Sequence, residues 1–160
     1  GFQALVKSGL LPYGNFEDAT ETSPTLFYND ADQHVAKMVE TRIANTNSPW
    51  LAGVEVGDVY AIPVSHGEGK FVVTDEEFAE LRDNGQIFSQ YVDFDGKPSM
   101  DSKYNPNGSV NAIEGITSKN GQIIGKMGHS ERYEDGLFQN IPGNKDQHLF
   151  RSAVEYFTKA

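Results

Sequence analysis

Two apolar segments on either side of a turn determine the strand pattern of this chain: Ile113-Glu114-Gly115-Ile116-Thr117 and Gln122-Ile123-Ile124-Gly125-Lys126-Met127. Asn120-Gly121 lies between them, and both residue types tolerate a positive φ, so the stretch predicts a β-hairpin. Titratable side chains follow at once in Gly128-His129-Ser130-Glu131-Arg132. Catalytic groups of α/β proteins commonly lie where a strand ends. The end of this hairpin is therefore the first candidate for a functional site.

Helical and extended patterns alternate along the rest of the chain. The spacing of apolar residues predicts helices over 1–10, 75–85 and from 144 onward, and strands over 34–43, 59–64 and 86–92. Thr74 and Glu77 have the spacing of a capping box, in which each side chain bonds the backbone of the other. Pro63 favours an edge position for its strand because proline cannot donate to a ladder. The pattern predicts an α/β layered sheet in a single domain, 1–160.

Composition excludes several classes of protein. The chain has 160 residues and a formal net charge of −10, which disfavours direct binding to nucleic acid. No apolar run approaches the ~20 residues needed to cross a bilayer, so we expect no membrane span. The chain contains no cysteine, which excludes disulfides, a cysteine-based zinc site and a thiol nucleophile within these residues.

His129 and Glu131 are two positions apart after the hairpin. In an extended turn such residues point to the same side, so the carboxylate can reach one imidazole nitrogen and leave the other free as a base. On this spacing alone, two solvated surface residues are the commoner explanation. A metal site built from these two residues with His66 and Glu68 is a further alternative, although the linear spacing matches no metal motif.

Two loops carry polar or glycine-rich sequence. His66-Gly67-Glu68-Gly69 follows a predicted strand, and its glycines allow either a tight turn or close approach of a ligand to the backbone. Asn105-Pro106-Asn107-Gly108-Ser109 consists of turn-forming residues, which explain it without any binding role.

Taken in order, five stretches resemble one family, the C-terminal glutaminase domain of phosphoribosylformylglycinamidine synthase in its large single-chain form. The similarity covers nearly the whole chain, and the usual family form has proline where Ser130 stands. The matching stretches are Gly1-Phe2-Gln3-Ala4-Leu5, Thr41-Arg42-Ile43-Ala44-Asn45-Thr46-Asn47-Ser48-Pro49, His66-Gly67-Glu68-Gly69, Asn105-Pro106-Asn107-Gly108-Ser109 with Gly115-Ile116, and Met127-Gly128-His129-Ser130-Glu131-Arg132.

The resemblance implies a partial flavodoxin-like, class I glutamine amidotransferase layer with an added hairpin, in a cytoplasmic enzyme. It implies that a Cys–His–Glu triad hydrolyses glutamine, with His129 as general base and acid and Glu131 as its orienting partner. The implied substrate-binding residues are Gln3, His66, Gly67, Glu68, Asn105, Asn107 and Ser109. It implies no cofactor and no metal in this chain. The implied partner is a synthetase domain of the same polypeptide, which uses ATP and Mg²⁺ to convert formylglycinamide ribonucleotide to its amidine.

In the family pattern the nucleophilic cysteine lies two positions before Gly1, so we expect this chain alone to be inactive. We also expect the first parallel strands of the sheet to lie upstream, leaving an open strand edge and an uncapped first helix that favour self-association. Two other functions remain open from the sequence: a non-catalytic regulatory or docking domain with the same fold, and a metallohydrolase.

Overall fold

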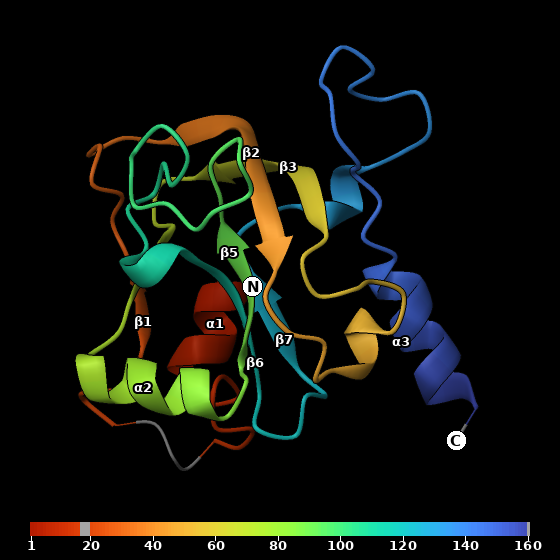
Figure 1. Ribbon diagram of the computed structural model, residues 1–160. Coiled ribbons are helices and arrows are strands. Elements are labelled where there is room, and N and C mark those ends of the chain that lie inside the picture. The colour runs from red at the N-terminus through yellow and green to blue at the C-terminus, as the bar shows by residue number, and fades with distance from the viewer. Residues whose placement is uncertain (17–19, 160) are drawn as a thin grey trace.

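The computed structural model describes residues 1–16 and 20–159, and it contains a curled sheet with helices around it (Figure 1). The three α-helices are α1 (Phe2–Lys7), α2 (Asp75–Asp83) and α3 (Leu149–Thr158). The strands are β1 (Thr25–Phe27), β2 (Val35–Ile43), β3 (Val59–His66), β4 (Lys70–Val72), β5 (Ile87–Tyr91), β6 (Ile113–Thr117) and β7 (Ile124–Lys126). Three short 3₁₀ helices, η1 (Pro49–Leu51), η2 (Val110–Ala112) and η3 (Ser130–Arg132), complete the described elements.

Five strands form the main sheet in the order β3-β2-β5-β6-β7, and β1 pairs with β4 in a separate two-stranded sheet. The mixed α/β class is confirmed. Every pair of strands in the described residues is antiparallel, so the parallel strands expected of a flavodoxin-like sheet are not among them. β3 lies at one edge of the main sheet, which confirms the edge position that Pro63 predicted.

The predicted hairpin is present as β6 and β7, with Gly115 opposite Lys126 and Thr117 opposite Ile124. Its turn differs from the expected one with two positive φ angles. Gly121 adopts a φ of +71°, whereas Asn120 is not among the residues with positive φ. The backbone N–H of Gly121 donates to the carbonyl of Ser118 at 2.8 Å. The turn therefore closes over Lys119 and Asn120, and glycine is needed only at the position that follows them.

The helices occupy shorter segments than the sequence predicted. α1 ends at Lys7, and Gly9 follows with a φ of +81°, a conformation that stops a helix. α1 has no side-chain cap, as expected. In α2, the Thr74 hydroxyl accepts from the backbone N–H of Glu77. The second half of the capping box was wrong, because the Glu77 carboxylate instead accepts a hydrogen bond from the Tyr13 hydroxyl at 3.0 Å.

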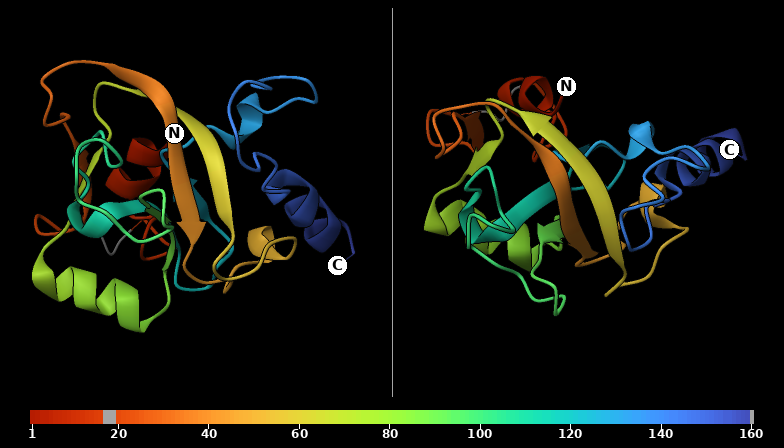
Figure 2. Two further views of the ribbon diagram at one scale, coloured as in Figure 1. Left: turned by 45° about the horizontal axis from the view of Figure 1, so that its top comes forward. Right: turned by 90° about the horizontal axis from the view of Figure 1, so that it is seen from above.

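α3 begins at Leu149, later than the predicted start near 144, because the preceding segment makes other contacts. The carbonyl of Asn144 accepts from the backbone N–H of Ala61 in β3 at 2.7 Å. Figure 2 shows α3 beside η1 at one side of the molecule, away from α2. The first core cluster joins α1 to both sheets and includes Phe2, Val6, Phe71, Ile116 and Met127, while the second joins the main sheet to η1 and α3 and includes Ile43, Leu51, Ile62, Phe88 and Leu149.

Across the described parts of the chain, no helix has both the length and the apolar character that crossing a bilayer requires.

Candidate active site

The segment that follows β7 rests on the edge strand β3. Met127 is buried in the first core cluster, and the backbone N–H of His129 donates to the carbonyl of Pro63 at 2.8 Å. η3 then begins at Ser130. In the described chain, the outer side of β3 has no neighbouring strand in the main sheet, so the Pro63 carbonyl is free to accept this hydrogen bond. The bond fixes the backbone of His129 against the edge of the sheet.

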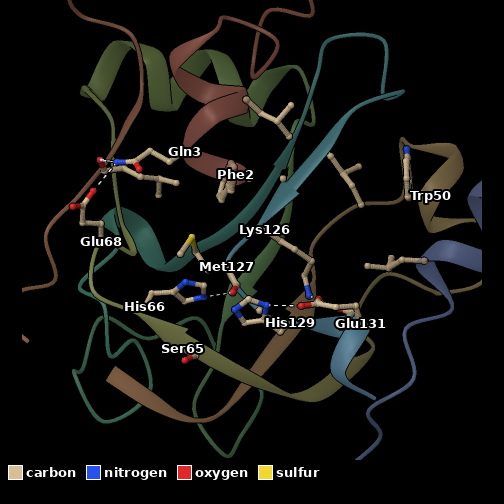
Figure 3. Close-up of a pocket in the computed structure, with 18 of the residues that line it drawn as sticks. Phe2, Gln3, Trp50, Ser65, His66, Glu68, Lys126, Met127, His129 and Glu131 are labelled. Carbon is tan, nitrogen blue, oxygen red and sulfur yellow. Dashed lines mark hydrogen bonds and ion pairs between the residues drawn. The ribbon is translucent and has the colours of Figure 1, made fainter. Parts of the chain in front are cut away.

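His129 and Glu131 form a short hydrogen bond, with 2.6 Å between Nδ1 and Oε1 (Figure 3). The contact predicted from their spacing is therefore present. Burial alone would raise the pKa of Glu131, but its own backbone N–H and the hydrogen bond to His129 outweigh burial, and the pKa is lowered. An ionised carboxylate here favours the tautomer of His129 with a proton on Nδ1. Nε2 has no hydrogen-bond partner among the described residues, so it is the nitrogen left to act as a base.

The side chain of His66 packs against that of His129. Their imidazole rings are stacked, with centroids 4.8 Å apart and planes inclined by 13°. Nε2 of His66 donates to the carbonyl of Met127, so this nitrogen carries a proton. Burial lowers the pKa of His66, and the proximity of the His129 ring acts in the same direction, although the Met127 carbonyl opposes the shift. His66 is thus held as a neutral ring beneath the candidate base.

A cavity of about 820 Å³ joins this turn to the beginning of the chain. Gly1, Phe2 and Gln3 form part of its wall, facing the loop that contains Gly67 and Glu68 (Figure 3). His66, His129 and Glu131 also line this cavity. Residues from three distant parts of the sequence therefore meet at one concave site, which is the usual form of a small-molecule site.

Gln3 and Glu68 contact each other at the cavity wall. Nε2 of Gln3 donates to Oε2 of Glu68 at 2.8 Å and to the carbonyl of Leu26 at 3.3 Å. Both residues were candidates for substrate contact, and the structure brings them together. Glu68 is consequently turned toward α1. In the described residues, no group of three or more histidine and acidic side chains is arranged to hold a metal ion.

Asn105, Asn107 and Ser109 are buried and do not line the cavity. Asn105 and Ser109 bond each other through side chain and backbone, which closes the turn between them. The Ser109 hydroxyl donates to the carbonyl of Gly69 and accepts from the backbone N–H of Phe71. These residues lie outside the cavity and hold the backbone that follows Glu68. Their position does not favour direct contact with a substrate.

Several residues of the site were missed by reasoning from the sequence. Trp50 and Phe150 line the far side of the cavity as an edge-to-face pair, with centroids 6.4 Å apart. Trp50 is anchored by a hydrogen bond from its indole N–H to the carbonyl of Gln122 at 2.9 Å. Lys126 and Glu114 lie directly under the His129 turn. The sequence does give one sign of Lys126 and Glu114, because each is a charged residue within a mostly apolar predicted strand.

Comparison with known proteins agrees with this geometry. Residues 1–157 match the CobB/CobQ-like glutamine amidotransferase domain. Among curated relatives, the phosphoribosylformylglycinamidine synthase subunit PurQ of Thermomicrobium roseum is 37% identical over 84% of this chain and 52% of its own length. The subunit of the same name from Aquifex aeolicus is 35% identical over 89% of this chain and 57% of its own length.

A solved structure, "Structure of PurLQS from Thermotoga maritima", superimposes with a TM-score of 0.68 and 25% identity, covering 98% of this chain and 58% of that chain. The chain thus spans little more than half the length of the relatives that it matches. The extent of the domain match and the agreement in fold decide the classification. This chain belongs to the CobB/CobQ-like glutamine amidotransferase domain family.

Proposed function

We propose that this chain is the glutaminase portion of a phosphoribosylformylglycinamidine synthase. The observation that carries the proposal is the His129–Glu131 hydrogen bond in a cavity that Gly1, Phe2 and Gln3 also line. The names of the curated relatives support the same enzyme. Those relatives are separate subunits, whereas the motifs of this chain resemble the large single-chain form, and we propose the latter as the parent.

The reaction needs a nucleophile that these 160 residues do not contain, since the chain has no cysteine. We place the sulfur two positions before Gly1, where the family's motif has it. Because Gly1 and His129 line the same cavity, a side chain at that position would enter the site from the α1 side. The chain without it is expected to be inactive.

In the proposed mechanism the thiolate attacks the carboxamide carbon of glutamine, and the C–N bond breaks to leave a glutamyl thioester. His129 takes up the thiol proton at Nε2 and donates it to the departing nitrogen, which leaves as ammonia. Water then attacks the thioester, with Nε2 accepting a proton from water and returning it to the sulfur, and glutamate is released. Glu131 keeps the proton on Nδ1 and stabilises the imidazolium that forms.

Glutamine is the proposed substrate, and Gln3, Glu68 and Gly67 are proposed to bind it because they face His129 across the cavity. The ammonia is proposed to pass to a synthetase domain, where ATP and Mg²⁺ would support formation of the amidine. We assign the described residues of this chain no role in binding ATP or Mg²⁺.

Release of ¹⁵N-ammonia from amide-labelled glutamine tests the proposal. We expect none above background from the 160 residues alone, and release from a polypeptide extended upstream through the cysteine. In the extended polypeptide, His129→Asn should abolish release, while His148→Asn, outside this cavity, should retain it. Release from the short chain would contradict the proposed nucleophile, and undiminished release by His129→Asn would contradict the proposed base.

A further inference from the structure

A buried ion pair lies under the His129 turn, and the proposed reaction does not use it. Nζ of Lys126 is 3.6 Å from Oε1 of Glu114, and the two side chains are 10% and 0% exposed. Taking two charges out of water is costly, and such a pair is often no more stable than apolar residues of the same volume. A pair of this kind calls for a role other than stability.

Glu114 holds the residue immediately before His129. Its Oε1 accepts a hydrogen bond from the backbone N–H of Gly128 at 2.6 Å. A side chain at Gly128 would prevent this approach, because a Cβ there would lie 2.9 Å from Oε1 of Glu114, 3.2 Å from Nζ of Lys126 and 2.6 Å from Cγ2 of Ile62. Gly128 is therefore required by the close contact with the buried carboxylate.

Lys126 holds the residue immediately after His129. Its ammonium donates to the hydroxyl of Ser130 at 2.8 Å and to Oε1 of Gln147 at 2.8 Å. Ser130 in turn donates to the same oxygen of Gln147 at 2.5 Å, and Gln147 is 1% exposed. Burial lowers the pKa of Lys126, while Glu114 opposes the shift by favouring the charged form. The ammonium thus contacts Ser130, Gln147 and Glu114 together.

We propose that Lys126 and Glu114 are positioning residues that hold both chain neighbours of His129 and thereby keep its Nδ1 directed at Glu131. The pair sets the backbone at 128 and the side chain at 130, and the Pro63 carbonyl holds the amide of His129 between them. The consequence for glutamine hydrolysis rests on the proposed function, whereas the consequence for the orientation of the imidazole does not.

Two variants remove the Lys126 ammonium, one with the Glu114 carboxylate kept and one with it removed. Lys126→Met removes one partner and leaves the Glu114 carboxylate buried and unpaired, which threatens folding. The double variant Glu114→Leu/Lys126→Met replaces both charges with apolar groups and leaves no unpaired charge. If the single variant does not fold, the effect of losing the ammonium is measured in the double variant. Lys119→Met is the matched control, because Lys119 forms an exposed pair with Glu80 at 3.1 Å.

The first readout is the tautomer of His129 in this chain, measured by long-range ¹H–¹⁵N correlation. We expect one dominant form with the proton on Nδ1 in the original sequence and in Lys119→Met, and averaged nitrogen shifts in the folded variants that lack Lys126. The second readout is steady-state glutaminase kinetics of the cysteine-containing polypeptide. We expect kcat to fall about 10–100-fold, as for lost outer-shell partners, with KM changed less than about twofold.

A third variant separates positioning from simple packing. Ser130 is the first residue of η3, a position where proline is tolerated and fixes φ without help from a side chain. In a Ser130→Pro background, Lys126→Met should therefore cost less in kcat than it does with serine. Unchanged tautomer and kcat in the folded variants lacking Lys126 would overturn the proposal. An altered tautomer together with no glutaminase activity in any cysteine-containing form would uphold the positioning and contradict the proposed function.

Discussion

The imidazole rings of His66 and His129 lie parallel, with their centroids 4.8 Å apart. The arrangement is asymmetric. His66 donates its Nε2 proton to the Met127 carbonyl, whereas His129 is hydrogen-bonded through Nδ1 to Glu131. Two imidazolium rings at this separation would repel each other, so the stack requires at least one neutral ring. The neutral ring is His66, because burial lowers its pKa.

This asymmetry predicts a pH dependence of stability. A histidine whose pKa is lowered by folding binds protons more weakly in the native state than in the unfolded chain. The free energy of unfolding is then unaffected by His66 well above about pH 6.5, and it falls as the pH drops below that value toward the native pKa. Urea unfolding at pH values between about 5.5 and 7.5 measures the slope. His66→Phe should flatten it.

His34→Phe is the matched control, because His34 is exposed, and it should keep the original slope. Glu131 contributes in a separate window. Its lowered pKa gives stability that is present above about pH 4.5 and is lost as the pH falls through the native value. An identical slope near pH 6 in His66→Phe and the original sequence would contradict the neutral state of His66.

Glu131→Gln tests the orienting role of the carboxylate. An amide of the same shape can bond Nδ1 without favouring the imidazolium, so the loss should appear in kcat. We expect a decrease on the order of 10²–10⁴-fold in the cysteine-containing polypeptide, with the fold retained. Glu134→Gln changes an exposed carboxylate nearby and serves as the control in the same assay. Equal kcat values for the two variants would remove Glu131 from the mechanism.

Gly128→Ala tests the close packing under the site. The added Cβ would lie 2.6 Å from Cγ2 of Ile62 and 2.9 Å from Oε1 of Glu114, so the neighbours must move. We expect a loss of about 1–3 kcal/mol in the free energy of unfolding, the usual cost of overpacking. Gly67→Ala has no atom within 4 Å of the new Cβ and should cost much less. Chemical denaturation of both variants compares them, and equal stabilities would refute the contact.

Self-association is expected because α3 exposes apolar side chains and because the main sheet ends in two edge strands. Phe150, Val154 and Phe157 are 56%, 61% and 46% exposed, and β7 ends the main sheet. Exposed apolar patches and open edges favour pairing with another chain. Light scattering of the 160-residue chain should show oligomers that increase with concentration. A strictly monomeric particle at high concentration would contradict this expectation.

Local features of the site were predictable from the sequence, and distant contacts were not. The His129–Glu131 contact depends only on two residues in one turn, so their spacing was sufficient. The stacking of His66 depends on the contact between β3 and the segment that follows β7, which no local pattern reveals. Gly115, the residue after Glu114, lies opposite Lys126 across the hairpin. That register follows from the turn, but the burial of both charges does not.

In the fold, too, local elements were predictable from the sequence and the pairing of distant strands was not. The ranges of β2, β5 and β6 were close to the predicted ones, because alternating residues mark the first two and the Asn120-Gly121 turn marks the end of the third. β1 and β4 contain three residues each, too few for a period of two to be recognised. Apart from the β6–β7 hairpin, the antiparallel pairing of the strands in residues 1–16 and 20–159 also escaped prediction, since strand order is set by contacts between distant segments. Alternation of helices and strands gave the α/β class without the direction of the strands.

We propose that His129 activates a cysteine thiol across the cavity that Gly1 and Glu131 line. A crystal structure of the polypeptide extended upstream through that cysteine measures it directly, as the distance from Sγ to Nε2 of His129. We expect a separation within about 4 Å, close to hydrogen-bond reach, with the Nδ1–Glu131 contact kept. A sulfur lying outside this cavity, or nearer to another base than to His129, would contradict it.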